Sequence, residues 1–246
     1  MTITITTVRD YEAMSQTAAD HFYHAIQAKP DIHIGLATGG TPAGMYEALI
    51  QNIRANALPL GAIQTFNLDE YIGLSQDDPN SYYTFMKDTL FAPLKLSRNQ
   101  TYVPDGNTSD HEMECGRYEA LIDEHGIDLQ LLGVGENGHI GFNEPGTPFD
   151  SVTHVIELND TTREANARYF NSPDDVPTHA ITMGIRSILK AKKIVLLASG
   201  ANKAEAISAL FRDTITEDWP ITALNTHPDV TVIVDEAAAS RIPEQK

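Results

Sequence analysis

Short apolar runs alternate along the chain with stretches that carry apolar residues at helical spacing. Residues Thr2–Val8 alternate polar and apolar positions as a half-buried strand does. Helix-like stretches begin after Asp10 and near residues 81 and 110. Further strand-like runs lie at residues 31–37, 63–67, 128–134, 193–198 and 230–234. This alternation predicts an α/β fold with a mostly parallel, twisted sheet covered by helices on both faces. With no repeat or linker in its 246 residues, the chain is expected to form a single domain, residues 1–246.

The strand-like run at residues 31–37 ends in a glycine-rich turn that leads into a helix-like stretch. The turn reads Thr38, Gly39, Gly40, Thr41 and then a proline. Glycine lets a backbone approach a ligand closely, and proline suits the first turn of a helix. The unpaired N–H groups of a helix start bind anions, so the turn is a candidate phosphate site. The alternative is an ordinary tight turn capped by Thr41. The GKS or GKT ending of a P-loop is absent.

An acidic pair, Asp69 and Glu70, follows the strand-like run at residues 63–67. Ligands of parallel sheets bind beyond the carboxyl ends of the strands, where a carboxylate can reach them. A carboxylate there suits the removal of a proton next to a carbonyl or imine carbon. We favour Asp69 because it directly follows the apolar Leu68. The alternative is a solvated helix cap or a surface pair with Glu70.

The loop at residues 133–146 carries the densest set of candidate groups. Its opening matches the G-x-G-x-x-G pattern of dinucleotide sites, which requires a helix to begin there. Gly141 and Pro145 would break such a helix, so a nicotinamide dinucleotide is disfavoured. His139 is suited to acid–base work near neutral pH, and Glu144 would fix its tautomer and raise its pKa. A loop histidine without a catalytic role is the alternative, but the two neighbouring ligand-like loops favour function.

Basic residues are scarce: the chain has 17 Lys and Arg against 34 Asp and Glu, a formal net charge of −17. This balance argues against nucleic-acid or anionic-membrane partners, which need a basic footprint. Arg168 lies in the segment TTREANARYF, and Lys203 opens a helix-like stretch after the strand-like run at residues 193–198. Both are candidate phosphate ligands, and the alternative for each is a solvated side chain.

The remaining features indicate a cytoplasmic protein without a bound metal. A single cysteine, Cys115, is expected to be a packing residue, and one cysteine forms no internal disulfide. The N-terminus lacks a signal-peptide pattern, and no run approaches the ~20 apolar residues of a membrane span. His21 and His24 are three residues apart on a helix-like stretch but have no evident third ligand, and zinc and calcium motifs are absent.

Several segments taken together closely resemble the glucosamine-6-phosphate deaminase (isomerase) family, from about residue 30 to residue 235. They are LATGGTPAGMYEAL, FNLDEYIGL, SYYTFM, LLGVGENGHIGFNEPG, TTREANARYF and SGANKA. The family is related in fold to 6-phosphogluconolactonases, ribose-5-phosphate isomerases and sensor domains of sugar-responsive repressors. Lactonases typically carry a GHTASLFP-like segment where this chain reads GHIGFNEP, which favours the deaminase. The resemblance implies a Rossmann-like fold of the sugar-phosphate isomerase and deaminase type.

The implied reaction converts glucosamine 6-phosphate and water into fructose 6-phosphate and ammonia, in amino sugar catabolism, without an organic cofactor or metal. By resemblance, His139 opens the sugar ring, Glu144 orients His139, and Asp69 moves a proton from C2 to C1. Residues 38–41, Arg168 and Lys203 would then bind the phosphate. A mobile lid is expected within residues 145–180.

Two departures from the family pattern carry expectations of their own. Asn137 stands where many members have Asp, so the pKa of His139 should be lower than in those members. Allosteric hexameric members carry basic residues between the NEP and TTR motifs, where this chain has His154 and Ile156. The chain also ends soon after Ile242, without their longer tail. We therefore expect no allosteric activation and a monomer or weak homo-oligomer.

Two competing functions stay open at this stage. The first is another enzyme of the same fold, a lactonase or isomerase of a related sugar phosphate or a galactosamine 6-phosphate deaminase. The second is a sugar-phosphate sensor domain of a repressor. Against the sensor stand the net charge of −17, the strand at the very start of the chain, and the presence of both Asp69 and His139.

Overall fold

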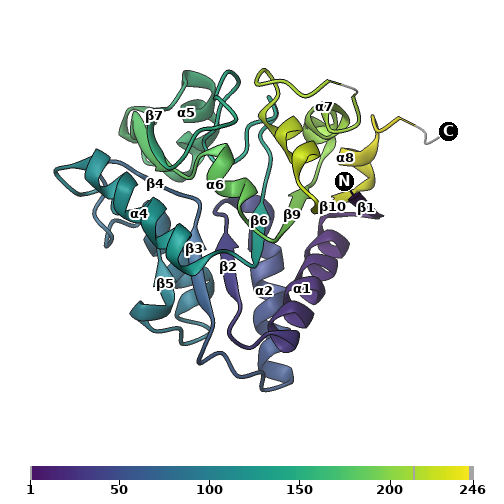
Figure 1. The fold of residues 1–246 in the computed structure, drawn as a ribbon, viewed down its shortest axis with the longest axis horizontal. Coiled ribbons are helices and arrows are strands. Elements are labelled where there is room, and N and C mark those ends of the chain that lie inside the picture. Colours follow the sequence, from purple (N-terminus) through teal and green to yellow (C-terminus); the bar gives the residue numbers. More distant parts are fainter. Residues whose placement is uncertain (1, 213, 244–246) are drawn as a thin grey trace.

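A seven-stranded, all-parallel sheet forms the centre of the computed structural model, which describes residues 2–212 and 214–243 (Figure 1). The strand order is β1-β10-β9-β6-β2-β3-β5. The strands are β1 (Thr2–Val8), β2 (His33–Leu36), β3 (Gln64–Asn67), β5 (Thr101–Tyr102), β6 (Leu129–Leu132), β9 (Lys193–Ala198) and β10 (Asp229–Asp235). The predicted parallel sheet is confirmed, and the runs at 31–37 and 128–134 are shorter as strands because their ends already belong to loops.

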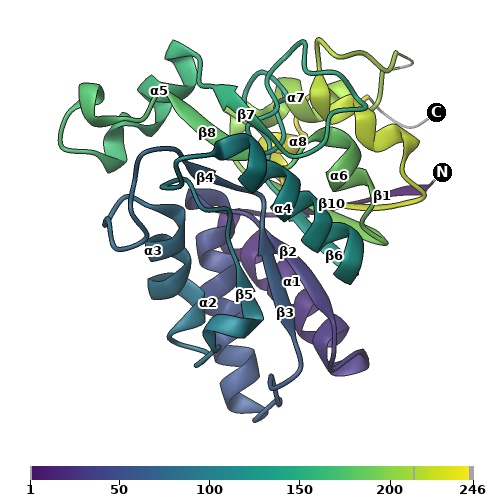
Figure 2. The same cartoon turned by 60° about the vertical axis from the view of Figure 1, so that its left-hand side comes forward.

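Helices cover both faces of this sheet, as the alternating pattern predicts (Figures 1 and 2). The long helices α1 (Tyr11–Ala28) and α2 (Gly40–Ala55) pack against each other on one face. On the other face lie α4 (His111–His125), α6 (Ile185–Leu189) and α7 (Ala204–Ala209). Right-handed crossovers explain the division, because the chain steps from β1 to β3 in one direction across the sheet and from β6 to β10 in the other.

The predicted helix starts have a local cause in side-chain capping. The side chains of Asp10, Ser81 and Asp110 accept hydrogen bonds from the backbone N–H three residues further on. They are the N-caps of α1, α3 (Tyr82–Met86) and α4, and α3 continues into a π-helical turn at Lys87–Phe91. Two short helices, α5 (Asp160–Asn166) and α8 (Glu236–Ala239), complete the α-helices of the described residues.

A second, antiparallel sheet was not predicted from the sequence. It consists of β4 (Asp69–Tyr71), β8 (His179–Thr182) and β7 (His154–Glu157), in the order β4-β8-β7. Asp69 is paired with Thr182 across it. In Figure 1 this sheet and α5 lie beyond one end of the parallel strands. Because β4 begins two residues after β3 ends, the strand end that carries Asp69 is held in a ladder rather than in a free loop.

The strand order reverses between β2 and β6, which are neighbours in the sheet. The chain leaves β2 toward β3 and β5, and leaves β6 toward β9 and β10, so the loops after these two strands diverge. Such a reversal opens a crevice at the carboxyl ends of the strands. The side chain of Gln130 on β6 occupies the space beside Gly35 of β2, where a Cβ would lie 2.0 Å from its Oε1.

Outside this crevice, the structure bears on two further expectations. Cys115 is buried on α4, and burial raises the pKa of its thiol to about 11, as expected of a packing residue. Within the described residues, no helix has the length and apolar character needed to cross a membrane.

Candidate active site

A cavity of about 660 Å³ opens at the carboxyl edge of the sheet, beside the point where the strand order reverses. It brings together the loop after β2, the strand β4, the loop after β6 and the segment around α5. The cavity is lined by every predicted site residue except Glu144: Thr38, Gly39, Gly40, Thr41, Asp69, Asn137, His139, Arg168 and Lys203. Three loops that are far apart in the sequence thus meet where the strand ends predict.

The loop after β2 ends in the N-terminus of the 16-residue helix α2. Its N-cap is Gly39, which has φ 103°, a conformation that favours glycine, and which offers no side chain to the first N–H groups. These N–H groups therefore remain available to an anion in the cavity. The hydroxyl of Tyr169 lies opposite, 3.6 Å from where a Cβ of Gly40 would be.

Two cations face the same part of the cavity. Lys203 ends a 3₁₀ turn, Ala201–Lys203, that follows Gly200, and Arg168 comes from another 3₁₀ turn, Ala167–Tyr169. Partial burial lowers the pKa of Lys203, the charge of Glu136 raises it, and the charge of Arg168 lowers it further. A lysine and an arginine that repel each other across a cavity are stabilised by an anion placed between them.

Asp69 presents a buried carboxyl group to the cavity, with an exposed fraction of 6%. Burial, and then the negative charge of Glu70, raise its pKa to about 8. Among the described residues, no hydrogen bond or cation offsets this burial. The carboxylate approaches the backbone of Gly141, since a Cβ there would lie 3.6 Å from its Oδ2. Asp69 is thus a much stronger base than an ordinary aspartate once it is ionised.

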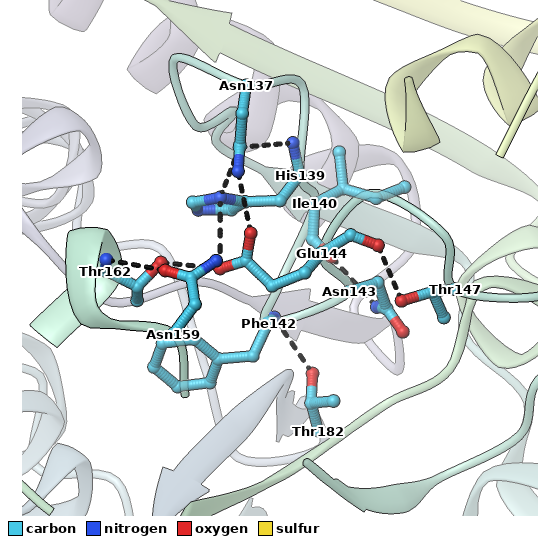
Figure 3. A network of polar contacts seen from close by, with 10 residues as sticks. All are labelled: Asn137, His139, Ile140, Phe142, Asn143, Glu144, Thr147, Asn159, Thr162 and Thr182. Atoms are coloured by element: carbon cyan, nitrogen blue, oxygen red, sulfur yellow. Dashed lines mark hydrogen bonds and ion pairs between the residues drawn. The ribbon is translucent and has the colours of Figure 1, made fainter. Parts of the chain in front are cut away.

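His139 is held in a chain of hydrogen bonds that Figure 3 shows from close by. Its Nδ1 lies 2.8 Å from Oδ1 of Asn137, and Nδ2 of Asn137 donates to Oε2 of Glu144 at 2.7 Å. A carboxylate can only accept hydrogen bonds, so the amide nitrogen of Asn137 faces Glu144 and its oxygen faces His139. That oxygen can only accept, so Nδ1 of His139 carries the proton. Its Nε2 is then unprotonated and able to accept one.

Glu144 therefore acts on His139 mainly through Asn137, whereas the sequence suggested direct orientation. Its Oε1 is 3.7 Å from Nδ1 of His139 and accepts a hydrogen bond from Oγ1 of Thr162 at 2.5 Å. Burial lowers the pKa of His139, the charge of Glu144 raises it, and Lys203 lowers it. The carboxylate lies behind the cavity wall, and α5 is attached to it through Thr162.

Two of the three glycines in the G-x-G-x-x-G match have structural reasons that involve no dinucleotide. A Cβ on Gly135 would lie 2.2 Å from two atoms of the His139 ring, which packs against its backbone. Gly138 has φ 83°, and a Cβ there would lie 2.6 Å from Cε3 of Trp219. A Cβ on Gly133, the first glycine of the match, would meet no atom within 4 Å.

An aromatic wall of the cavity was missed in the sequence analysis. It consists of Tyr71, Tyr82, Phe142 and Phe170, from β4, α3, the loop after β6 and the segment after α5. The rings of Tyr82 and Phe142 are stacked 6.0 Å apart, and the Tyr82 hydroxyl donates to that of Tyr71 at 3.2 Å. Their only trace in the sequence was their place in the quoted motifs, because ring packing depends on tertiary contacts.

The chain is similar in sequence to known proteins over most of its length. A family model described as glucosamine-6-phosphate isomerases/6-phosphogluconolactonase matches residues 9–233. A glucosamine-6-phosphate deaminase of Geobacillus sp. (strain WCH70) is 53% identical, with 96% of this chain and 95% of that protein covered. Glucosamine-6-phosphate deaminase 1 of Bacillus subtilis (strain 168) is also 53% identical, with 95% and 97% covered.

Solved structures extend the comparison. A structure described as a monomeric glucosamine-6-phosphate deaminase superposes with a TM-score of 0.95 at 52% identity, covering 97% of this chain and 100% of that one. A 6-phosphogluconolactonase from Trypanosoma brucei has a TM-score of 0.79 at 20% identity, covering 98% and 99%. The second likeness concerns the fold alone.

Proposed function

The chain belongs to the family of glucosamine-6-phosphate isomerases and 6-phosphogluconolactonases, and from that premise we propose that it is a glucosamine-6-phosphate deaminase. The enzyme converts glucosamine 6-phosphate and water into fructose 6-phosphate and ammonia. The observation that carries this choice is Asp69, a buried carboxyl group of raised pKa on the wall of a cavity that also holds Arg168 and Lys203. Isomerisation must move a proton from one carbon to another, whereas hydrolysis of a lactone requires no proton transfer between carbons. The deaminase relatives are also the ones at about half identity.

Binding places the phosphate between Arg168, Lys203 and the first N–H groups of α2. These groups lie in one cavity with Asp69, so the phosphate fixes the distance of the sugar carbons from the carboxyl group. The aromatic wall of Tyr71, Tyr82, Phe142 and Phe170 supplies an apolar surface along the substrate and keeps water from the carboxyl group.

Ring opening is assigned to His139. In the tautomer fixed by Asn137, the free Nε2 takes the proton of the anomeric hydroxyl, and the protonated ring gives it to the ring oxygen. The imidazolium formed in between is stabilised by Glu144, whose carboxylate oxygen lies 3.7 Å from Nδ1. Burial keeps the resting ring neutral, which is the form that this step needs.

Proton transfer between the carbons is assigned to Asp69. The ionised carboxylate removes the proton from C2, the electron pair of that C–H bond forms a C1–C2 double bond, and the aldehyde oxygen takes up a proton from water, which gives an enolamine. The same carboxyl group then returns its proton to C1 while the nitrogen lone pair forms a C=N bond, which leaves a protonated imine at C2. Water adds to C2, the nitrogen leaves as ammonia and the extra proton returns to water, so that a ketone remains at C2. One buried carboxyl group suits a shuttle because few water molecules compete for its proton.

Assembly, location and lid motion are further parts of the proposal. A monomer is supported by the structural relative at 52% identity, whose description calls it monomeric. Cytoplasmic location stays a prediction from the single cysteine and from the metabolic role. The expected lid within residues 145–180 also stays a prediction; it is supported by the cavity-lining residues that this segment supplies: Thr162, Asn166, Arg168, Tyr169 and Phe170.

Product analysis tests the function directly. Purified enzyme with a metal chelator is given glucosamine 6-phosphate, galactosamine 6-phosphate or 6-phosphogluconolactone in separate reactions. We expect ammonia and fructose 6-phosphate in equal amounts from the first, and slower or no release from the second. Hydrolysis of the lactone without ammonia release from either amino sugar would contradict the proposal and favour the lactonase alternative.

A further inference from the structure

Glu70 is a buried carboxylate next to Asp69, and it points away from the cavity because neighbouring residues on β4 face opposite sides. Its oxygens accept backbone N–H groups from three residues. Oε1 accepts from Tyr71 at 2.8 Å and from Tyr82 at 2.9 Å, and Oε2 accepts from Tyr83 at 2.9 Å. Three N–H donors aimed at one carboxyl group fit its ionised form.

Two of these donors belong to the first turn of α3. Tyr82 and Tyr83 are its first two residues, and the third N–H, of Thr84, is bound by Oγ of Ser81 at 3.0 Å. Glu70 therefore attaches the start of α3 to β4. Tyr82 leads from this attachment into the aromatic wall, where it stacks on Phe142 and donates to Tyr71. Its hydroxyl also contacts the side chain of Thr38 in the loop after β2.

We propose that Glu70 is a positioning residue of the deaminase site, which holds Tyr82 in the cavity wall through the start of α3 and supplies a negative charge behind Asp69. The inference rests on the proposed function, since it concerns the step in which Asp69 takes a proton. Glu70 itself does not line the cavity and is not assigned a contact with substrate.

The contacts of the two buried carboxyl groups favour ionisation of Glu70 before Asp69. Burial raises the pKa of Glu70 and its three backbone N–H donors lower it, whereas Asp69 has no such donor among the described residues. Once it is ionised, Glu70 opposes ionisation of Asp69 through its negative charge and so raises the pKa of Asp69. Glu70 thereby makes Asp69 a stronger base near neutral pH. Removing its charge should lower the pKa of Asp69.

Within the described part of the chain, the charges that act on the pair come from acidic groups. The charge of Asp105, after β5, raises the pKa of Glu70. The charge of Asp69 in turn raises the pKa of four tyrosines: Tyr46 of α2, Tyr71 of β4, Tyr82 of α3 and Tyr118 of α4. Burial keeps the pKa of each of these tyrosines above its ordinary value. The tyrosines are neutral across the working range, which leaves Glu70 as the main charge acting on Asp69.

The pH dependence of kcat/KM in Glu70→Gln tests the inference. Activity in the wild type should rise with pH as Asp69 ionises. Without the charge of Glu70 the midpoint of this rise should move to lower pH by about one unit, the scale of a like-charge pair. The glutamine side chain also has an NH₂ group in place of one carboxylate oxygen, and this group cannot accept a backbone N–H of α3. Tyr82 should therefore be displaced, and kcat at pH values above the midpoint should fall by about tenfold or more.

Two further variants separate the effect of the Glu70 charge from the effect of its hydrogen bonds to α3. Glu70→Asp keeps the charge on a shorter side chain, so kcat should fall while the midpoint stays near that of the wild type. Ser81→Ala removes the neighbouring cap of the same helix without a change in charge, and should also leave the midpoint in place. If Glu70→Gln does not fold, Glu70→Asp with wild-type kcat would by itself overturn the positioning role.

The outcomes distinguish this inference from the function on which it rests. A Glu70→Gln profile with the wild-type midpoint and plateau overturns the inference while ammonia release by the wild type still supports the function. A midpoint shift of equal size in Ser81→Ala would also overturn it, because a loosened helix alone would then explain the result. A wild type that releases no ammonia would overturn both.

Discussion

Two carboxylates of this enzyme, Asp69 at the cavity and Glu119 on α4, show opposite electrostatics. The Asp69 carboxyl group is buried beside another acid, and its pKa is raised to about 8. Burial also opposes ionisation of Glu119, but Lys190 and hydrogen bonds from Thr153 and Ser187 outweigh it and lower its pKa to about 2. Glu119 accepts from Nζ of Lys190 at 2.8 Å and from both hydroxyls at 2.7 Å.

The difference separates a carboxylate that stabilises the fold from one to which we assign proton transfer in the proposed reaction. Glu119 ties α4 to Thr153, at the approach to β7, and to α6, so it stabilises the folded chain in its ionised form. Ionisation of Asp69 does not stabilise the fold, because burial and the charge of Glu70 both oppose it. Groups with pKa values shifted in this way are concentrated at functional sites. Substitutions at the two positions should therefore have opposite consequences for activity and stability.

The largest expected effect is on catalysis, in Asp69→Asn. Loss of the proposed proton shuttle should lower kcat by about 10³-fold, within the range of general acid–base catalysis, with a smaller change in KM. Ammonia release in a steady-state assay measures it. A variant with wild-type kcat would refute the assignment of Asp69.

The same variant should be at least as stable as the wild type at alkaline pH. Because the folded-state pKa of Asp69 is raised, the folded wild type binds its proton more tightly than the unfolded chain does. Its contribution to stability is therefore full below about pH 4 and is lost as the pH rises toward 8. The Tm of Asp69→Asn minus that of the wild type should increase from pH 5 to pH 8. A decrease over this interval would contradict the raised pKa.

A smaller effect is expected on substrate binding, in Lys203→Met. Loss of one charged group of the proposed phosphate site should raise KM by about 10- to 100-fold, with less change in kcat. Lys192→Met is the matched control, because Lys192 pairs with Asp128 at the amino end of the strands, away from the cavity. Equal KM values for Lys203→Met and the wild type would remove Lys203 from the phosphate site.

Glu119→Gln should reduce stability and leave the pH dependence of kcat/KM in place. Loss of a charged, multiply hydrogen-bonded group should lower the free energy of unfolding at pH 7 by about 2 kcal/mol. Because the pKa of Glu119 is lowered on folding, its contribution is full above about pH 4.3 and disappears as the pH falls toward 2. Urea unfolding of the wild type and the variant measures this difference in the free energy of unfolding at pH 7, and should give a smaller difference at pH 3. A shifted kcat/KM midpoint would show that Glu119 is coupled to the site.

The smallest expected effect is in Asn137→Asp. The new carboxylate would lie 2.8 Å from Nδ1 of His139 and beside Glu144, so it should raise the pKa of His139 and move its limb of the kcat–pH profile to higher pH by up to about one unit. A profile that superimposes on that of the wild type would show that charge at this position has no influence on ring opening.

Local patterns predicted the parallel sheet well because its signals lie within short segments. Lys193–Ala198 is a strand with the predicted bounds, and Asp10 and Asp110 are helix caps where the sequence placed helix starts. The antiparallel sheet was missed because β4 has three residues and β7 alternates too briefly to stand out. Strands this short are stabilised by their partners, which the sequence does not reveal.

The candidate site was predictable as three loops, and less so as an arrangement of side chains. Residues 38–41, Asp69 and His139 could be placed at one edge because parallel strands carry their loops there. The interposition of Asn137 between His139 and Glu144 depends on rotamers, and the attachment of α3 to Glu70 depends on contacts across twelve residues of chain. Neither arrangement follows from the sequence, because each depends on the three-dimensional positions of side chains.

The most direct test of the account follows one hydrogen atom. Glucosamine 6-phosphate deuterated at C2 is converted in ordinary water, and the fructose 6-phosphate formed in the first turnovers is analysed by NMR for deuterium at C1. In the proposed mechanism Asp69, a buried carboxyl group, both removes and returns the proton, so part of the deuterium is expected at C1. Loss of all deuterium to the solvent in every turnover would contradict it, since the proton would then pass through a group open to water.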